Sequence, residues 1–171
     1  LFFASQIDGY FSPRMINRIA TSVAVILPIA IGQAMVVMTR NIDLSVGSVV
    51  GIVAYLIGDY LGSHGDLHPV LVILMALALG SLCGVINGVL VAYGGVPSII
   101  ATLGTLALFR TYLVEYSDAR TITTSGLPQW LVDLPQMTLF SIGSFDMRLI
   151  VAMALASALI FWLALSRLRM A

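Results

Sequence analysis

PVLVILMALALGSLCGVINGVLVA, residues 69–92, is an apolar stretch without a single charged side chain. A helix that crosses a membrane needs about 20 apolar residues, each of which adds about 1.5 Å. The apolar residues follow one another continuously, whereas the strands of a membrane barrel alternate apolar and polar residues. This stretch therefore predicts a transmembrane helix.

Four more segments of the chain share this length and character. In lipid, a spanning segment must satisfy its own backbone hydrogen bonds, which favours helices over open strands. The sequence therefore predicts an all-α integral membrane protein with about five transmembrane helices in a partial transmembrane domain of 171 residues. The four further spans are expected near residues 19–38, 44–61, 97–116 and 148–165.

The connections between these spans differ in length. Short turns are expected at 39–43 and 93–96, and a modest polar loop at 59–68. Residues 117–147 form a longer outer loop, and loops of more than about 15 residues are usually functional or act as linkers. Within this loop, LPQWLVDLP (127–135) is a short amphipathic piece with a tryptophan suited to the membrane interface.

Composition excludes several classes of protein. The chain is 60% hydrophobic and only 9% charged, whereas a soluble domain carries about 25% charged residues. Its net charge of zero argues against a nucleic-acid-binding protein. The single cysteine, Cys83, cannot form an internal disulfide. No glycine-rich phosphate loop is present, so we expect no bound nucleotide, no enzymatic activity, and energy supplied by a partner or an ion gradient.

A metal site is also not expected. His64 and His68 lie four residues apart with Asp66 between them. The segment SHGDLHP contains glycine and proline, which disfavour the helix that would fix ligand geometry at this spacing. We therefore predict that this chain binds no metal and no cofactor.

Both ends of the sequence suggest a piece of a longer membrane protein. LFFASQIDGY, residues 1–10, reads as the tail of an apolar helix rather than a signal peptide. The sequence ends with ALSRLRMA, whose arginines indicate a cytoplasmic end for the last span. Residues 39–43 and 93–96 would then also be cytoplasmic. Four other arginines would lie outside, against the usual bias: Arg14, Arg18, Arg120 and Arg148.

The turn TRNIDLSVGSVVG, residues 39–51, places charged residues between two apolar spans. Asp43 can accept hydrogen bonds from the free N–H groups near Ser45 at the start of the next helix. An ionisable group near membrane depth also indicates function, because its burial is costly. Capping and a place on a solute pathway are therefore both open for Asp43.

Rows of small residues at every fourth position allow close helix approach. They form either static packing faces or a seam along which helices move. The positions are Gly47 and Gly51 in one helix, and Gly80, Gly84 and Gly88 in another.

Several neutral polar residues lie inside the predicted spans. A carboxamide or hydroxyl in hydrocarbon must find a hydrogen-bond partner, in a neighbouring helix or in its own backbone. The alternative is that these groups line a pathway for a neutral polar solute. The pathway candidates are Asp43, Ser45, Asn87, Ser98, Thr102, Thr105 and Gln33.

Arg110, a charged residue in the predicted span 97–116, can pair with Glu115 or reach the membrane interface.

Two segments in this order, NIDLSVGSVVG (41–51) and GVINGVLVAYGGVPSIIATLGTLALFR (84–110), carry a family resemblance. They resemble the membrane permeases of bacterial ATP-binding-cassette importers for monosaccharides, the ribose, xylose, arabinose, rhamnose and autoinducer-2 group. The element IDLSVGS (42–48) is the most specific part. Where the family usually has two glycines before IDLS, this sequence has Arg40 and Asn41, and Thr111 stands where glycine is common.

The resemblance implies an inner-membrane protein of about ten spans, of which this chain holds the second to the sixth. It implies a second permease subunit, identical or different, and two cytoplasmic ATPase subunits that bind ATP and magnesium. It also implies a periplasmic sugar-binding protein and transport by alternating access. The loop that contacts the ATPase is expected beyond Ala171. The alternative function is a gradient-driven secondary transporter or channel for a small polar solute.

Overall fold

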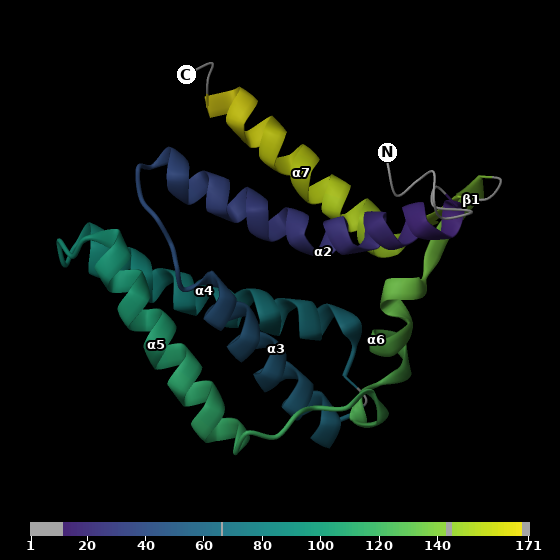
Figure 1. Cartoon of the computed structure of the whole chain (residues 1–171), viewed down its shortest axis with the longest axis horizontal. Coiled ribbons are helices and arrows are strands. Elements are labelled where there is room, and N and C mark those ends of the chain that lie inside the picture. The colour runs from purple at the N-terminus through teal and green to yellow at the C-terminus, as the bar shows by residue number, and fades with distance from the viewer. Residues whose placement is uncertain (1–11, 66, 143–144, 169–171) are drawn as a thin grey trace, which may run out of the picture. The chain divides into compact units, whose positions relative to one another are not determined.

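The computed structural model describes residues 12–65, 67–142 and 145–168. Its described part contains five long helices (Figure 1), each long and apolar enough to cross a membrane. The predicted all-α membrane class is therefore confirmed. The five helices are α2 (Pro13–Met38), α3 (Val46–Ser63), α4 (Pro69–Ala92), α5 (Ser98–Ser117) and α7 (Leu149–Leu168).

The observed helices follow the predicted spans, with one larger difference. Helix α2 begins at Pro13 rather than near residue 19, because the helical backbone continues through polar turns that hydropathy does not mark. Proline suits this first position, since it has no N–H to leave unpaired. Pro28, inside α2, cannot donate to the carbonyl of Ala24.

Three predictions fall wholly or partly on positions that the structure does not describe. The reading of residues 1–10 as the tail of a helix lies outside the described residues. Asp66, considered with the two histidines, lies outside them as well, and so does Arg169.

The chain divides into two compact units, residues 1–34 with 133–171 and residues 35–132. The first unit contains most of α2, a pair of strands and α7. Arg148, at the end of the second strand, donates a hydrogen bond to the hydroxyl of Thr21 in α2 over 3.0 Å. This contact joins two segments of the unit that are far apart in the sequence.

The long loop at 117–147 contains a pair of strands that the sequence did not predict. Strands β1 (Thr138–Ile142) and β2 (Phe145–Arg148) pair antiparallel, with Ser141 opposite Asp146. Each strand is too short for its alternation to stand out in the sequence. Tertiary context supports the pair, since Leu149 N–H donates to the carbonyl of Met137 over 2.8 Å.

The second unit packs α3, α4 and α5 together. Ile57, Leu61 and Val72 form its buried apolar cluster. A short helix of the long loop, α6 (Gln129–Asp133), lies between the 3₁₀ turns η1 (Thr124–Gly126) and η2 (Leu134–Gln136). Within this unit, Trp130 and Leu131 of α6 pack against the apolar cluster. The predicted amphipathic piece therefore covers the ends of α3 and α4.

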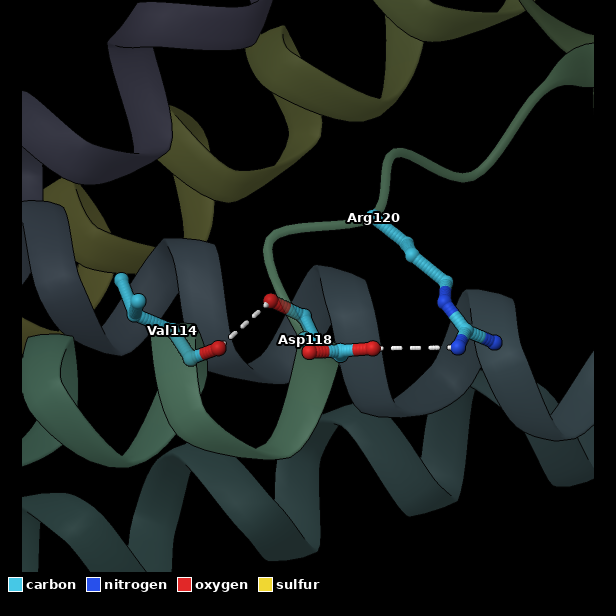
Figure 2. A network of polar contacts seen from close by, with 4 residues as sticks. Val114, Asp118 and Arg120 are labelled. Carbon is cyan, nitrogen blue, oxygen red and sulfur yellow. Dashed lines mark hydrogen bonds and ion pairs between the residues drawn. The ribbon is translucent and has the colours of Figure 1, made fainter.

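Helix α5 ends in a left-handed turn, which Figure 2 shows. Asp118 has φ 51° and Ala119 has φ 54°, and the Asp118 N–H donates to the carbonyl of Val114. The Arg120 guanidinium donates to the Asp118 carboxylate over 3.0 Å. Because both side chains are 79% exposed, this ion pair contributes little stability.

Candidate functional site

The segment between α2 and α3 is longer than the predicted tight turn. Helix α2 ends with the Arg40 N–H donating to Val37 O (2.9 Å) and the Asn41 N–H donating to Val36 O (3.2 Å). With Arg40 at φ 60°, these bonds form the Schellman motif, whose left-handed position usually holds glycine. Arg40 therefore occupies the place where a glycine would fit without strain, which gives a physical reason for the glycines of the resembled family.

The backbone of Ile42 is hydrogen-bonded to hydroxyl groups of α5. Its N–H donates to Ser98 Oγ over 3.2 Å. The Thr102 hydroxyl lies 3.3 Å from Ile42 O and 2.7 Å from Ser98 O, so the two carbonyls share its proton. In a membrane protein, non-helical backbone is tolerated where protein buries it or where it lines a water-filled cavity.

Asp43 binds the start of α3 much as its position predicts. One carboxylate oxygen accepts from the Ser45 N–H at 2.8 Å and from the Ser45 hydroxyl at 2.6 Å. Helix α3 itself begins at Val46. These two bonds fix the chain that enters α3.

A chain of hydrogen bonds continues from Ser45 into the other two helices. The Asn87 amide of α4 donates to Ser45 Oγ over 2.7 Å, and the Thr105 hydroxyl of α5 donates to Asn87 Oδ1 over 2.7 Å. Ser45 is fully buried, and Asn87 and Thr105 are 6% and 3% exposed. The network therefore joins α3, α4 and α5 through groups that are all satisfied, as buried polar groups must be.

The network also places the break between α2 and α3. Asn87 lies five residues before the end of α4, and Thr105 lies seven residues after the start of α5. At 1.5 Å per residue, α3 begins about 8–10 Å inside the ends of these helices. Ile42 meets Ser98 at the first residue of α5, so residues 42–45 run alongside the start of α5 before α3 begins.

A cavity of about 320 Å³ lies beside this segment. Its polar wall comes from Thr39, Asn41, Asp43, Asn87, Ser98 and Thr102. Gly84 and Gly88 also line it, and a Cβ added at either glycine would meet no heavy atom within 4 Å. We call this space the Asp43 cavity; its size is at the small end of the roughly 300–1,000 Å³ typical of ligand pockets.

The predicted pathway residues divide into three groups. Asp43, Asn87, Ser98 and Thr102 line the Asp43 cavity. Ser45 and Thr105 hold Asp43 and Asn87 through hydrogen bonds. Gln33 belongs to the other compact unit.

Thr39 and Asn41 also line the cavity, but they were not predicted as site residues. The signal that could have found them is their position on either side of Arg40, in the polar turn before Asp43. The Asn41 amide donates to the Thr39 carbonyl over 3.0 Å, so the two residues form one local unit.

The predicted packing glycines show few neighbours within the described part of the chain. A Cβ added at Gly47, Gly80, Gly84 or Gly88 would meet no heavy atom within 4 Å, whereas one at Gly51 would lie 3.3 Å from Leu113 Cδ2. Close packing against the α4 glycines stays a prediction for the intact protein.

The two histidines take structural positions. His68 Nδ1 accepts from the Val70 N–H at the start of α4 over 3.3 Å, and the His64 ring stacks on Tyr60 at 4.4 Å. Among the described residues, no group of three histidine, cysteine, aspartate or glutamate side chains could hold a metal ion.

Comparison with known proteins connects this geometry to a family. Residues 15–170 match the family described as branched-chain amino acid transport system / permease component. The chain is 40% identical over 149 residues to the autoinducer 2 import system permease protein LsrC of Yersinia pseudotuberculosis serotype O:3 (strain YPIII), covering 85% of this chain and 41% of the relative. It is 42% identical over 150 residues to LsrC of Yersinia enterocolitica serotype O:8 / biotype 1B, covering 86% and 41%.

No solved structure was found to match the chain. The chain spans about 41% of the length of these curated relatives. The family match covers nearly all of the present chain, including α3, α4, α5 and the Asp43 cavity. The chain therefore belongs to the branched-chain amino acid transport system / permease component family, and it is a multi-pass protein of the bacterial inner membrane.

Proposed function

We propose that this chain is part of the transmembrane subunit of an ATP-driven importer for a monosaccharide or a similarly small polyhydroxy solute. The Asp43 cavity is then a segment of the translocation pathway. The observation that carries this proposal is the set of hydroxyl, amide and carboxylate groups that meet at a break between two membrane helices. Non-helical backbone at membrane depth is tolerated where it lines a water-filled cavity, which suits a solute pathway.

The chemistry of the cavity favours a neutral solute with many hydroxyl groups. Asp43 accepts hydrogen bonds, and the Asn87 amide and the Ser98 hydroxyl can both donate and accept. Among the described residues that line the cavity, none is cationic. An amino acid would bring a carboxylate without a partner there, so the cavity supports a sugar-like solute over the amino acids in the family description.

The partners follow from the same proposal. A second permease subunit would complete the pathway, and two cytoplasmic ATPase subunits would bind ATP and magnesium. A periplasmic binding protein would deliver the solute, and this chain would hold no cofactor. The names of the curated relatives, which are permease proteins of an import system, support this assembly. The hydrogen bonds of Ile42 to α5 couple the break to a neighbouring helix, so a shift of α5 would reshape the cavity.

Reconstituted transport tests this function. Vesicles that contain the full permease, its ATPase subunits and its binding protein should take up a labelled pentose or deoxyhexose only when ATP is supplied. The control replaces ATP with a non-hydrolysable analogue. Uptake that continues without ATP and stops when the ion gradient is collapsed would establish the gradient-driven alternative instead.

A further inference from the structure

Arg110 is a cation in the interior of α5. At 1.5 Å per residue it lies about 18 Å from the first residue of the helix and about 10 Å from the last. Within the described part of the chain its side chain is exposed and makes no hydrogen bond or ion pair. Glu115 lies about 140° away around the helix, which prevents the pairing considered from the sequence. Charged side chains within membrane spans almost always face the bundle interior or a water-filled cavity, which indicates that this side of α5 faces water or protein.

A groove of about 310 Å³ lies between α3 and α5 beside Arg110. Its lining comes from Gly47, Ser48 and Gly51 of α3 and from Leu106, Arg110 and Leu113 of α5. A Cβ added at Gly47 would meet no heavy atom within 4 Å, so the wall on this side is low. We call this space the Arg110 groove.

Aromatic rings and a carboxylate follow the Arg110 groove along the same two helices. The Tyr116 ring meets Tyr55 edge-on, with centroids 6.2 Å apart, and stacks with Tyr112 at 5.9 Å. The Tyr116 hydroxyl donates to Asp59 Oδ2 over 3.2 Å. Tyr112 and Tyr116 are 52% and 49% exposed. These residues therefore present both ring surface and a hydrogen-bond acceptor.

One row of residues connects the Asp43 cavity to this aromatic group. Residues four apart share one side of a helix, and this spacing continues from the start of α3 almost to its end. Ser45 and Thr105 meet through Asn87 near one end, and Asp59 and Tyr116 meet near the other, so α3 and α5 run in the same direction. Within α3 the row consists of Gly47, Gly51, Tyr55 and Asp59, and Asp43 lies in the non-helical segment just before the helix.

We propose that the Arg110 groove and the adjoining Tyr55, Tyr112 and Tyr116 rings form a second solute-contacting stretch of the pathway, which accepts a neutral polyhydroxy solute. This proposal rests on the proposed function and extends it. The guanidinium offers a fork of N–H donors to solute hydroxyls, and Asp59 offers an acceptor. The rings supply flat apolar surface with a polar edge, which suits the C–H faces of a sugar ring.

Thiol labelling tests whether the Arg110 groove holds water. The experiment uses the full permease with its ATPase subunits in membranes, with Cys83 and any other cysteine replaced. A water-soluble methanethiosulfonate should modify Ser48→Cys about tenfold or more faster than Leu108→Cys, because a thiol needs a polar environment to form the reactive thiolate. Leu108 is a matched control, since it is 67% exposed on the other side of α5. Equal inertness of both cysteines would overturn the proposal, because it would show that the groove holds no water.

Variants of Arg110 test the contact with solute. Arg110→Gln should reduce uptake of the labelled pentose or deoxyhexose by about tenfold, as expected when a charged hydrogen-bond donor is lost. Arg110→Lys, which keeps the charge, should retain more uptake than Arg110→Gln. Unchanged uptake in Arg110→Gln would contradict a role for Arg110 in the pathway.

The two experiments separate this inference from the proposed function. Labelling does not depend on transport, so rapid modification of Ser48→Cys supports a water-filled groove even if ATP-driven uptake fails. Normal ATP-driven uptake with an inert Ser48→Cys would overturn the groove and leave the proposed function standing.

Discussion

The two ends of the α3–α5 pair differ in how their polar groups are buried and hydrogen-bonded. At the Asp43 end, Ser45, Asn87 and Thr105 are buried and bonded to one another across three helices. At the Tyr116 end, the polar groups are exposed, and Arg110 is satisfied by nothing in the described part of the chain. The difference teaches that this chain satisfies the buried polar groups at the first end by itself, whereas Arg110 at the second end requires water, solute or further protein.

The largest effect is expected from a substitution that disrupts the buried hydrogen-bond network. Asn87→Leu removes the donor to Ser45 and the acceptor for Thr105. We expect it to lower the free energy of unfolding by about 3 kcal/mol, because two buried polar groups lose their partner. Unfolding of the full permease in mixed micelles, followed by circular dichroism, measures this change.

Val85→Leu is the matched control, since it introduces the same residue on α4 at a position that is 59% exposed. It should change stability by well under about 1 kcal/mol. If both variants were equally stable, the hydrogen-bond network would not hold the three helices together.

The second effect concerns charge in the Asp43 cavity. Asp43→Asn keeps an oxygen that can accept from the Ser45 N–H and hydroxyl, so the fold should persist. The variant loses the stronger, charge-assisted hydrogen bond to a solute hydroxyl, and we expect uptake to fall by about tenfold, equivalent to about 1.4 kcal/mol. Uptake in vesicles and thermal unfolding are measured together. Full uptake at normal stability would restrict Asp43 to capping α3.

The third effect concerns the strained residue beside the cavity. Arg40→Gly should raise the free energy of unfolding by about 1 kcal/mol, because an L-residue at positive φ is strained and glycine is not. Asn41→Gly, one residue further along and not at positive φ, should give no such gain. A loss of stability in Arg40→Gly would show that the arginine side chain makes a contact in the intact protein.

The smallest effect is expected at the exposed end of the α3–α5 pair, from loss of the Tyr116 hydroxyl. Tyr116→Phe loses a single exposed hydrogen bond to Asp59, so we expect a change in unfolding free energy of about 0.5 kcal/mol or less. Tyr112→Phe serves as the reference for removal of a tyrosine hydroxyl from the same aromatic group. A cost for Tyr116→Phe as large as that of Asn87→Leu would mean that this end is buried in the intact protein.

The sequence predicts the helices well because long apolar runs leave few alternatives in a membrane. Once α5 is predicted, helical spacing alone places Ser98, Thr102 and Thr105 on one side of it. It shows that Asn87 needs a partner but not which one, because Ser45 lies 42 residues away in the chain and the partner depends on how α3 and α4 pack.

Other features depend on tertiary context that no local pattern contains. Strands β1 and β2 were missed because each is short and its support comes from α7 and the preceding turn. Arg40 could be recognised as unusual, but its left-handed conformation follows from where α2 ends. Asn87 lines the Asp43 cavity, whereas Thr105 bonds to Asn87 without lining it, and this difference likewise depends on how the helices pack.

The most direct test of the central claim measures water and solute at the Asp43 cavity. Ser98→Cys is placed in the full permease with Cys83 and other cysteines replaced, and its reaction with a water-soluble thiol reagent is followed in membranes. Ile100→Cys is the control, because Ile100 is 63% exposed and lies about 200° from Ser98 around α5. We predict that Ser98→Cys reacts rapidly and is slowed by the transported sugar, while Ile100→Cys is inert. An inert Ser98→Cys, or one whose reaction is unaffected by every imported sugar, would contradict the account.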